Sequence, residues 1–188
     1  MNKKSSPKEK EPKMSSFFQS SLNFAKKTLI KKGQFTTMVV GESANGELLA
    51  FFGDYSNDEE KKIFIRLIQI SFLAASVGRY IFMSEAWMSE TLRSKKNLTN
   101  KKFPRPSKDA NKVECLIVAE INREGKKAIL FEMNRDKNGN LIDLKEIKEL
   151  TDFSGIMAEF LPPKEARLPA TLMPIAQSFL KRCSQTIH

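Results

Sequence analysis

Residues 35–52 read FTTMVVGESANGELLAFF, and this stretch decides the fold of the chain. Two runs rich in apolar and β-branched residues, Phe35 to Gly41 and Glu47 to Phe52, flank the four residues Ser43 to Gly46. The Asn45-Gly46 pair between the runs is typical of a tight hairpin, because both residue types tolerate the positive φ angles of such a turn. The stretch therefore predicts two antiparallel strands.

A helix is expected upstream of this hairpin. After Ser15, apolar residues recur at three- and four-residue steps, the spacing of one helix face (Phe18, Leu22, Ala25, Leu29). Gly33 follows as a left-handed C-terminal residue. Lysines crowd the last turns, where the helix dipole favours cations (Lys26, Lys27, Lys31, Lys32).

A second helix is expected downstream of the hairpin. Ser56 and Glu59 match the S-x-x-E capping box, and we predict that this box precedes a helix over Ile63 to Val77, closed by Gly78. Apolar residues occur nearly all round this helix. It is therefore expected to lie deep between the sheet and another element.

Further strands are expected in the second half of the chain. Tyr80 to Met88 predicts a third strand, and Glu114 to Ile121 with Lys126 to Met133 predicts a hairpin. Leu141 to Leu150, which follows a turn at Asp136 to Asn140, favours an edge strand over a short helix.

The order of these elements indicates the fold class. A last helix is expected around Pro174 to Cys183, with Pro174 in its first turn. The resulting order, α-β-β-α-β-β-β-α, predicts an α+β fold with helices packed on an antiparallel sheet of about five strands. A chain of 188 residues suits one domain, which we expect over residues 15–188. A disordered basic tail is expected at residues 1–14 and a mobile basic loop at residues 89–112.

Cysteine usage and the N-terminal residues indicate the cell interior. Cys115 and Cys183 match no metal or paired-thiol spacing, and Cys115 lies in an apolar run that suits a buried thiol. The first 30 residues lack the apolar stretch of a secretory signal, and Ile63 to Val77 is too short for a bilayer span. We therefore expect a cytoplasmic protein without a membrane span.

The net charge of +10 is unevenly distributed along the chain. Residues 1–14 carry five Lys and two Glu, residues 15–32 carry four Lys and no acid, and residues 89–112 carry eight basic residues against Glu90 and Asp109. These three segments together carry +13, which leaves −3 for the rest of the chain. The folded body is therefore expected to be nearly neutral.

Concentrated basic charge favours a polyanionic partner, because neutralising phosphates releases counterions. The candidate binding residues are the basic side chains of the loop and the tryptophan just before it (Lys95, Lys96, Lys101, Lys102, Arg105, Lys108, Trp87). Lysine dominates over arginine, so sequence-specific reading of bases is not indicated. The alternative is that these segments are solvated spacers and that Trp87 seals the rim of the core.

The composition argues against several kinds of active site. His188 is the only histidine, which removes Ser-His and Cys-His nucleophile systems and most zinc sites. The 8 glycines are scattered singly, without a phosphate-binding loop or dinucleotide fingerprint, so no cofactor is expected.

Three glutamates are the remaining candidates for chemistry. Glu85 alternates with Met83 and Trp87 on one strand face, and burial of that face would raise its pKa. If Glu114 and Glu120 converge with Glu85 across paired strands, the three carboxylates would suit a divalent-metal-dependent nuclease. The other interpretation is that Glu85 makes a structural bond to a backbone amide, a lysine or an arginine.

The segment from Phe82 to Trp87 reads F-M-S-E-A-W and is followed by Pro106-Ser107-Lys108-Asp109 and by Glu114 at the start of a strand. This arrangement resembles a pattern in small uncharacterised proteins of bacteria and their phages, in which an S-E-A-W strand precedes a P-S-x-x-P/A-x-R/K-x-E segment. The resemblance implies no activity. It implies that the end of the basic loop docks near the strand that carries Glu85.

The order of elements also resembles that of roadblock and longin domains, which are regulatory dimerisation modules. We expect a non-enzymatic binding or regulatory module of bacterial or phage origin, whose basic loop and tail contact an acidic partner, either nucleic acid or an acidic protein surface. One alternative is the divalent-metal-dependent nuclease. The other is a dimerisation module whose homodimer contact is the sheet edge or the first helix.

Overall fold

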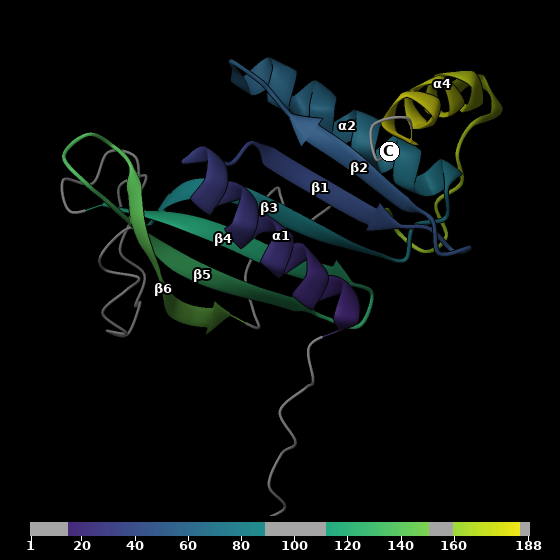
Figure 1. Ribbon diagram of the computed structural model, residues 1–188. Coiled ribbons are helices and arrows are strands. Elements are labelled where there is room, and N and C mark those ends of the chain that lie inside the picture. The colour runs from purple at the N-terminus through teal and green to yellow at the C-terminus, as the bar shows by residue number, and fades with distance from the viewer. Residues whose placement is uncertain (1–14, 89–111, 151–159, 185–188) are drawn as a thin grey trace, which may run out of the picture.

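The computed structural model describes residues 15–88, 112–150 and 160–184. These residues form an α+β fold around one antiparallel sheet (Figure 1), which confirms the predicted class. Apart from Lys112, the predicted tail and basic loop lie outside the described residues. The elements, in chain order, are α1 (Ser16–Lys32), β1 (Thr37–Glu42), β2 (Leu48–Gly53), α2 (Asp58–Ala74), β3 (Arg79–Met88), β4 (Val113–Asn122), β5 (Lys126–Arg135), β6 (Leu141–Leu150), the 3-10 turn η3 (Ala170–Leu172) and α4 (Met173–Ser184).

The sheet has six strands rather than the five predicted, in the order β2-β1-β3-β4-β5-β6. The predicted hairpin of β1 and β2 is confirmed: Val40 pairs with Ala50, and Gly46 turns the chain with a φ of 83°. β6 is the edge strand predicted at Leu141 to Leu150, and it follows a turn in which the Asp136 carboxylate accepts hydrogen bonds from the amides of Asn138 and Asn140. Among the strands that the structure describes, β2 and β6 therefore form the two margins of the sheet.

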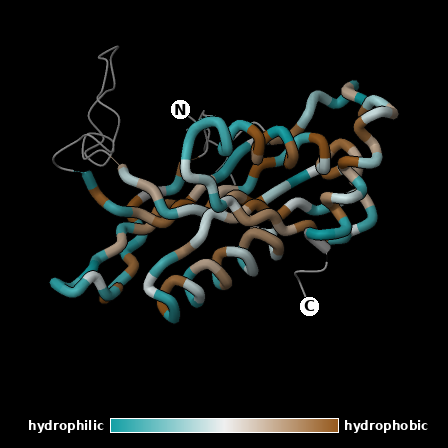
Figure 2. Tube along the Cα trace, turned by 90° about the horizontal axis from the view of Figure 1, so that it is seen from above, coloured by the Kyte–Doolittle hydropathy of each residue, from teal (hydrophilic) through white to brown (hydrophobic). Residues whose placement is uncertain are grey.

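Helices cover both faces of the sheet, as the view in Figure 2 shows. We call the two faces the α1 face and the α2/α4 face. Strand alternation sends Ile81 and Met83 toward α1, whereas Tyr80 and Phe82 point to the opposite side. Each face therefore has its own buried cluster, and the two clusters are separated by the backbone of the sheet.

The predicted first helix is confirmed at both ends. The Ser15 hydroxyl accepts a hydrogen bond from the Phe18 amide, which is the bond of a serine N-cap. Gly33 ends the helix in the left-handed conformation, with a φ of 72°. The predicted apolar stripe is the buried one, because it packs on the sheet (Phe18, Leu22, Ala25, Leu29).

The second helix differs from its prediction in its cap and its length. The predicted Ser56–Glu59 box is wrong: Asn57 is the N-cap, and its side chain accepts from the Glu60 amide. The Glu60 carboxylate accepts from the amide of Ser56, the residue before this N-cap, so Asn57 and Glu60 hold the start of the helix in place of Ser56 and Glu59. Ser56 and Asn57 are adjacent, and both residue types suit an N-cap, so the sequence pattern alone does not show which of the two caps the helix.

The C-terminal end of α2 also lies earlier than predicted. The helix ends at Ala74, and Ser76 then adopts a φ of 52°, so the turn does not use Gly78 as its left-handed residue. Val77 returns to the core, where it is buried. One stripe of α2 is buried rather than its whole circumference, since Ile63 is exposed, and the helix lies beside α4 on the sheet.

The α2/α4 face is closed by aromatic contacts. The Phe51 ring lies 5.7 Å from the rings of Phe72 in α2 and Phe179 in α4. Tyr80 continues this row, with its ring 5.4 Å from that of Phe160, and its hydroxyl accepts from the Phe160 amide. α4 matches the predicted last helix, with Pro174 in its first turn.

Candidate binding surface

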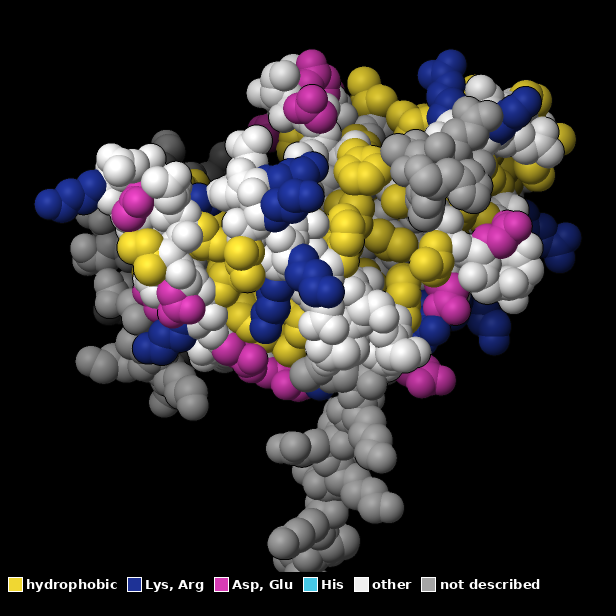
Figure 3. Space-filling model, viewed as in Figure 1, with side chains coloured by type: hydrophobic (Ala, Val, Ile, Leu, Met, Phe, Trp, Pro, Cys, Tyr) yellow, Lys and Arg dark blue, Asp and Glu magenta, His cyan; other side chains and the backbone are white. Residues whose placement is uncertain are grey.

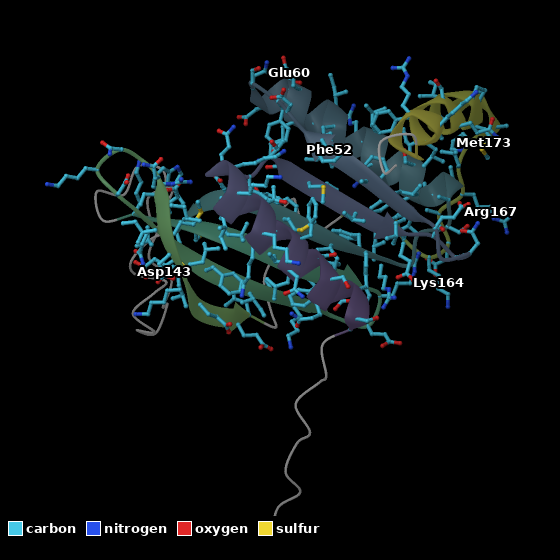
Figure 4. The ribbon with its side chains drawn as sticks, viewed as in Figure 1. Phe52, Glu60, Asp143, Lys164, Arg167 and Met173 are labelled. Atoms are coloured by element: carbon cyan, nitrogen blue, oxygen red, sulfur yellow. The ribbon has the colours of Figure 1, made fainter. Side chains whose placement is uncertain are left out.

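An apolar groove lies on the α1 face between α1 and the margin strand β2. It encloses about 420 Å³, and the lining side chains come from the helix and from three strands (Phe17, Ser20, Ser21, Phe24, Met38, Val40, Leu48, Ala50, Phe52, Met83). Two serines are the only polar residues in this lining. We call this surface the α1–β2 groove. Figure 4 labels Phe52, which β2 carries at the margin of the sheet.

The groove exists because α1 does not cover the whole of its face. Among the strands, α1 packs mainly against β3, β4 and β6, so the neighbouring side of β1 and β2 is left partly open. Three large apolar side chains are consequently half exposed: Phe24 (49%), Phe52 (49%) and Leu48 (45%). A contiguous exposed apolar surface of this kind is typical of binding sites in soluble proteins.

The helix beside the groove is strongly basic. The only charged residues of α1 are its four lysines, two of which continue the helix stripe that lines the groove. Lys27 and Lys31 follow Phe24 at three and seven residues, so they lie on the same side of the helix. Figure 3 shows this face, with hydrophobic side chains gathered between α1 and β2 and basic side chains beside them over α1.

A polar network fixes the end of α1 on the sheet, and it contains two of the predicted glutamates. The Arg135 guanidinium donates to the Glu114 carboxylate at 2.8 Å and lies 3.7 Å from that of Glu85. The same guanidinium donates to the Gly33 carbonyl, and the Glu85 carboxylate accepts from the Phe35 amide. This network ties three strands to the connection between α1 and β1.

The protonation of Glu85 reflects this position. Burial raises the pKa of the Glu85 carboxyl above its usual value, and the negative charge of Glu114 acts in the same direction. The Phe35 amide and the Arg135 guanidinium lower the pKa, but their effect is smaller. The Glu85 carboxylate contacts a backbone amide and an arginine, which supports the structural interpretation of Glu85.

Glu120 lies on the same strand face but away from the other two glutamates. In the β3–β4 register, Glu85 pairs with Leu116 and Glu120 pairs with Ile81, four residues along the strand. The Glu120 carboxylate accepts from the Ser15 hydroxyl at 2.7 Å. Within the described ranges, no three His, Cys, Asp or Glu side chains are grouped so that they could bind a metal ion.

Trp87 lies at the end of β3 and is 45% exposed, so it is not a core residue. The Lys112 ammonium lies 4.5 Å from the centre of its ring, in a cation–π contact. The other predicted binding residues lie outside the described residues (Lys95, Lys96, Lys101, Lys102, Arg105, Lys108). Cys115 is buried as expected, and burial raises the pKa of its thiol to about 11, so it is not a reactive thiolate.

No family model, curated protein or solved structure matches this chain. In the part of the chain that the structure describes, no helix combines the length and the apolar character that crossing a bilayer requires.

The sequence interpretation missed the α1–β2 groove. Its aromatic residues resemble ordinary core residues, because hydrophobicity alone does not tell which strand a helix covers. Two signals were nevertheless present. Phe17 and Phe24 widen the apolar face of α1 beyond its buried stripe, and β2 is apolar on both faces although it lies at a margin.

Proposed function

We propose that this protein is a non-enzymatic binding module that holds an acidic, partly apolar segment of a partner protein in the α1–β2 groove. The observation that carries the proposal is the pairing of an exposed apolar groove with a helix whose only charges are lysines. Apolar contact supplies affinity at such a surface, and opposite charge supplies orientation and fast association.

The chemistry of the groove favours a protein ligand over nucleic acid. A nucleic-acid site would place basic side chains along the whole groove, but the lining residues carry no charge. The lysines of α1 lie at one end and along the rim, where acidic side chains that flank an apolar segment would reach them. The basic tail and loop add long-range attraction for the same kind of partner.

Selection from a displayed library of random twelve-residue peptides tests this function. The peptides retained by the protein are expected to combine acidic and apolar residues. A Phe24→Ser/Phe52→Ser double variant should bind them about tenfold more weakly or worse, because both exposed rings are lost.

The matched control is an Ile63→Ser/Ile142→Ser double variant, which removes two exposed apolar side chains away from the groove. It should bind the selected peptides as the unchanged protein does. Selection of basic peptides, failure to select any peptide, or equal binding by the groove variant would each reject the proposal.

A further inference from the structure

The backbone of β2 has one row of polar groups bonded to β1 and one row that points outward. The Ser43 amide donates to the Glu47 carbonyl, so Ser43 and Glu47 form a bonded pair at the end of the β1–β2 ladder. Bonded pairs recur at every second residue, so the residues of β2 that bond to β1 are Leu49, Phe51 and Gly53. An antiparallel ladder alternates between bonded and non-bonded pairs. The amides and carbonyls of Leu48, Ala50 and Phe52 therefore point away from β1, along the open margin of the sheet.

The same three residues carry the side chains that line the groove. Leu48, Ala50 and Phe52 all point to the α1 face, and all three belong to the lining of the α1–β2 groove. Ala50 is a small residue between two large, half-exposed neighbours, Leu48 and Phe52. An extended chain that bonds to the outward row of β2 would therefore bring every second side chain onto the groove, with room for an apolar residue opposite Ala50.

β6, at the opposite margin of the sheet, does not share the uncharged and regular edge of β2. β6 reads LIDLKEIKEL and alternates charges of both signs, and its register with β5 shifts twice. Charged side chains and bulges are common means of protecting an edge strand from pairing. β2 reads LLAFFG, with no charge, no proline and a continuous register with β1. Figure 4 marks the contrast, with Phe52 on β2 and Asp143 on β6.

We infer that the partner segment binds as an added strand on the outer edge of β2, with apolar residues at alternate positions facing the α1–β2 groove and acidic residues around them. This inference rests on the proposed function and specifies the conformation of its ligand. The positive charge of α1 favours a segment of another protein over a second copy of this chain as the occupant of the β2 edge. Pairing β2 with its own copy would bring two helices that carry only lysine charges to one face, whereas an acidic segment would neutralise them.

The first test removes one outward amide. In Ala50→Pro, the missing N–H belongs to the row that points away from β1, so the β1 ladder keeps its bonds. The matched control is Ala50→Val, which adds similar bulk but keeps the amide. The probe is a labelled peptide of sequence EEVEVEFEE with blocked ends, followed by fluorescence anisotropy. Ala50→Pro should weaken its binding about tenfold relative to Ala50→Val, the effect of one lost hydrogen bond.

The second test leaves the protein unchanged, so it holds even if Ala50→Pro does not fold. One form of the peptide is N-methylated at its three apolar residues and another at three of its acidic residues. Because an added strand bonds through alternate amides, one form should lose binding and the other should keep it. Equal binding by both forms, together with an unaffected Ala50→Pro variant, would overturn the added-strand inference.

The outcomes also separate this inference from the proposed function. Binding that is weakened by Phe24→Ser/Phe52→Ser but unaffected by N-methylation would retain the groove and reject the added strand. No binding of EEVEVEFEE or of any selected peptide would reject both. Light scattering is expected to show a monomer, and a dimer that Ala50→Pro abolishes would identify a second copy as the occupant and overturn the inference.

Discussion

The two faces of the sheet are both apolar, but they are covered to different extents. On the α2/α4 face, two helices and Phe160 close over the strands, and the rings of Phe51 and Phe72 are almost fully buried. On the α1 face, a single helix covers β3 and β4 and leaves Phe24 and Phe52 half exposed. The same kind of side chain thus contributes to stability on one face and is available for binding on the other.

The largest expected effect separates the two faces by stability. Phe72→Ala should lower the free energy of unfolding by about 3–5 kcal/mol, because it opens a cavity among packed rings. Phe24→Ala on the α1 face should cost about 1 kcal/mol, since half of its ring already contacts water. Urea unfolding measures both values. Equal losses would mean that the α1 face is as closed as the other.

A second, smaller effect concerns the polar network that holds α1 over its face. Arg135→Met should lower the free energy of unfolding by about 1–3 kcal/mol, because the carboxylates of Glu85 and Glu114 lose their shared partner while they stay partly buried. Arg123→Met is the control, since its exposed guanidinium donates a long hydrogen bond of 3.4 Å to the Pro162 carbonyl. A loss no greater than in this control would show that α1 is held by apolar packing alone.

The pH dependence of Glu85→Gln gives a third, more subtle test of the same network. Burial raises the pKa of Glu85, so its contribution to stability is complete below the unfolded-state pKa of about 4.3 and is lost as the pH rises through the higher folded-state pKa. The free energy of unfolding of the unchanged protein, minus that of Glu85→Gln, should therefore fall between pH 4 and pH 7. A rise of this difference with pH would show that Arg135 and the Phe35 amide outweigh burial.

The smallest expected effect concerns the lysines beside the groove. Lys27→Gln/Lys31→Gln should weaken binding of EEVEVEFEE by roughly two- to fivefold at low salt, and the difference should shrink as salt screens the charges. Lys137→Gln/Lys145→Gln removes two exposed lysines near the other margin and serves as the control. If both double variants bind alike, the rim of α1 does not select acidic ligands.

Much of the fold follows from local patterns in the sequence. The Asn45-Gly46 turn, the stripe of α1 and the alternation of β3 are set by neighbouring residues, and each was predictable. The number of strands was harder, because the charged stretch of β6 suits a helix or an edge strand. The groove was not predictable, because it depends on which strands α1 covers. The Glu85–Arg135 contact joins residues fifty positions apart, and spacing does not reveal such a partner.

Hydrogen–deuterium exchange of the β2 amides tests the central claim most directly. Addition of EEVEVEFEE should slow exchange at the outward amides of Leu48, Ala50 and Phe52 and leave the amides of β6 unchanged, because an added strand bonds only to the open edge of β2. Saturating peptide that leaves these three amides unprotected, or that protects β6 instead, would contradict the account.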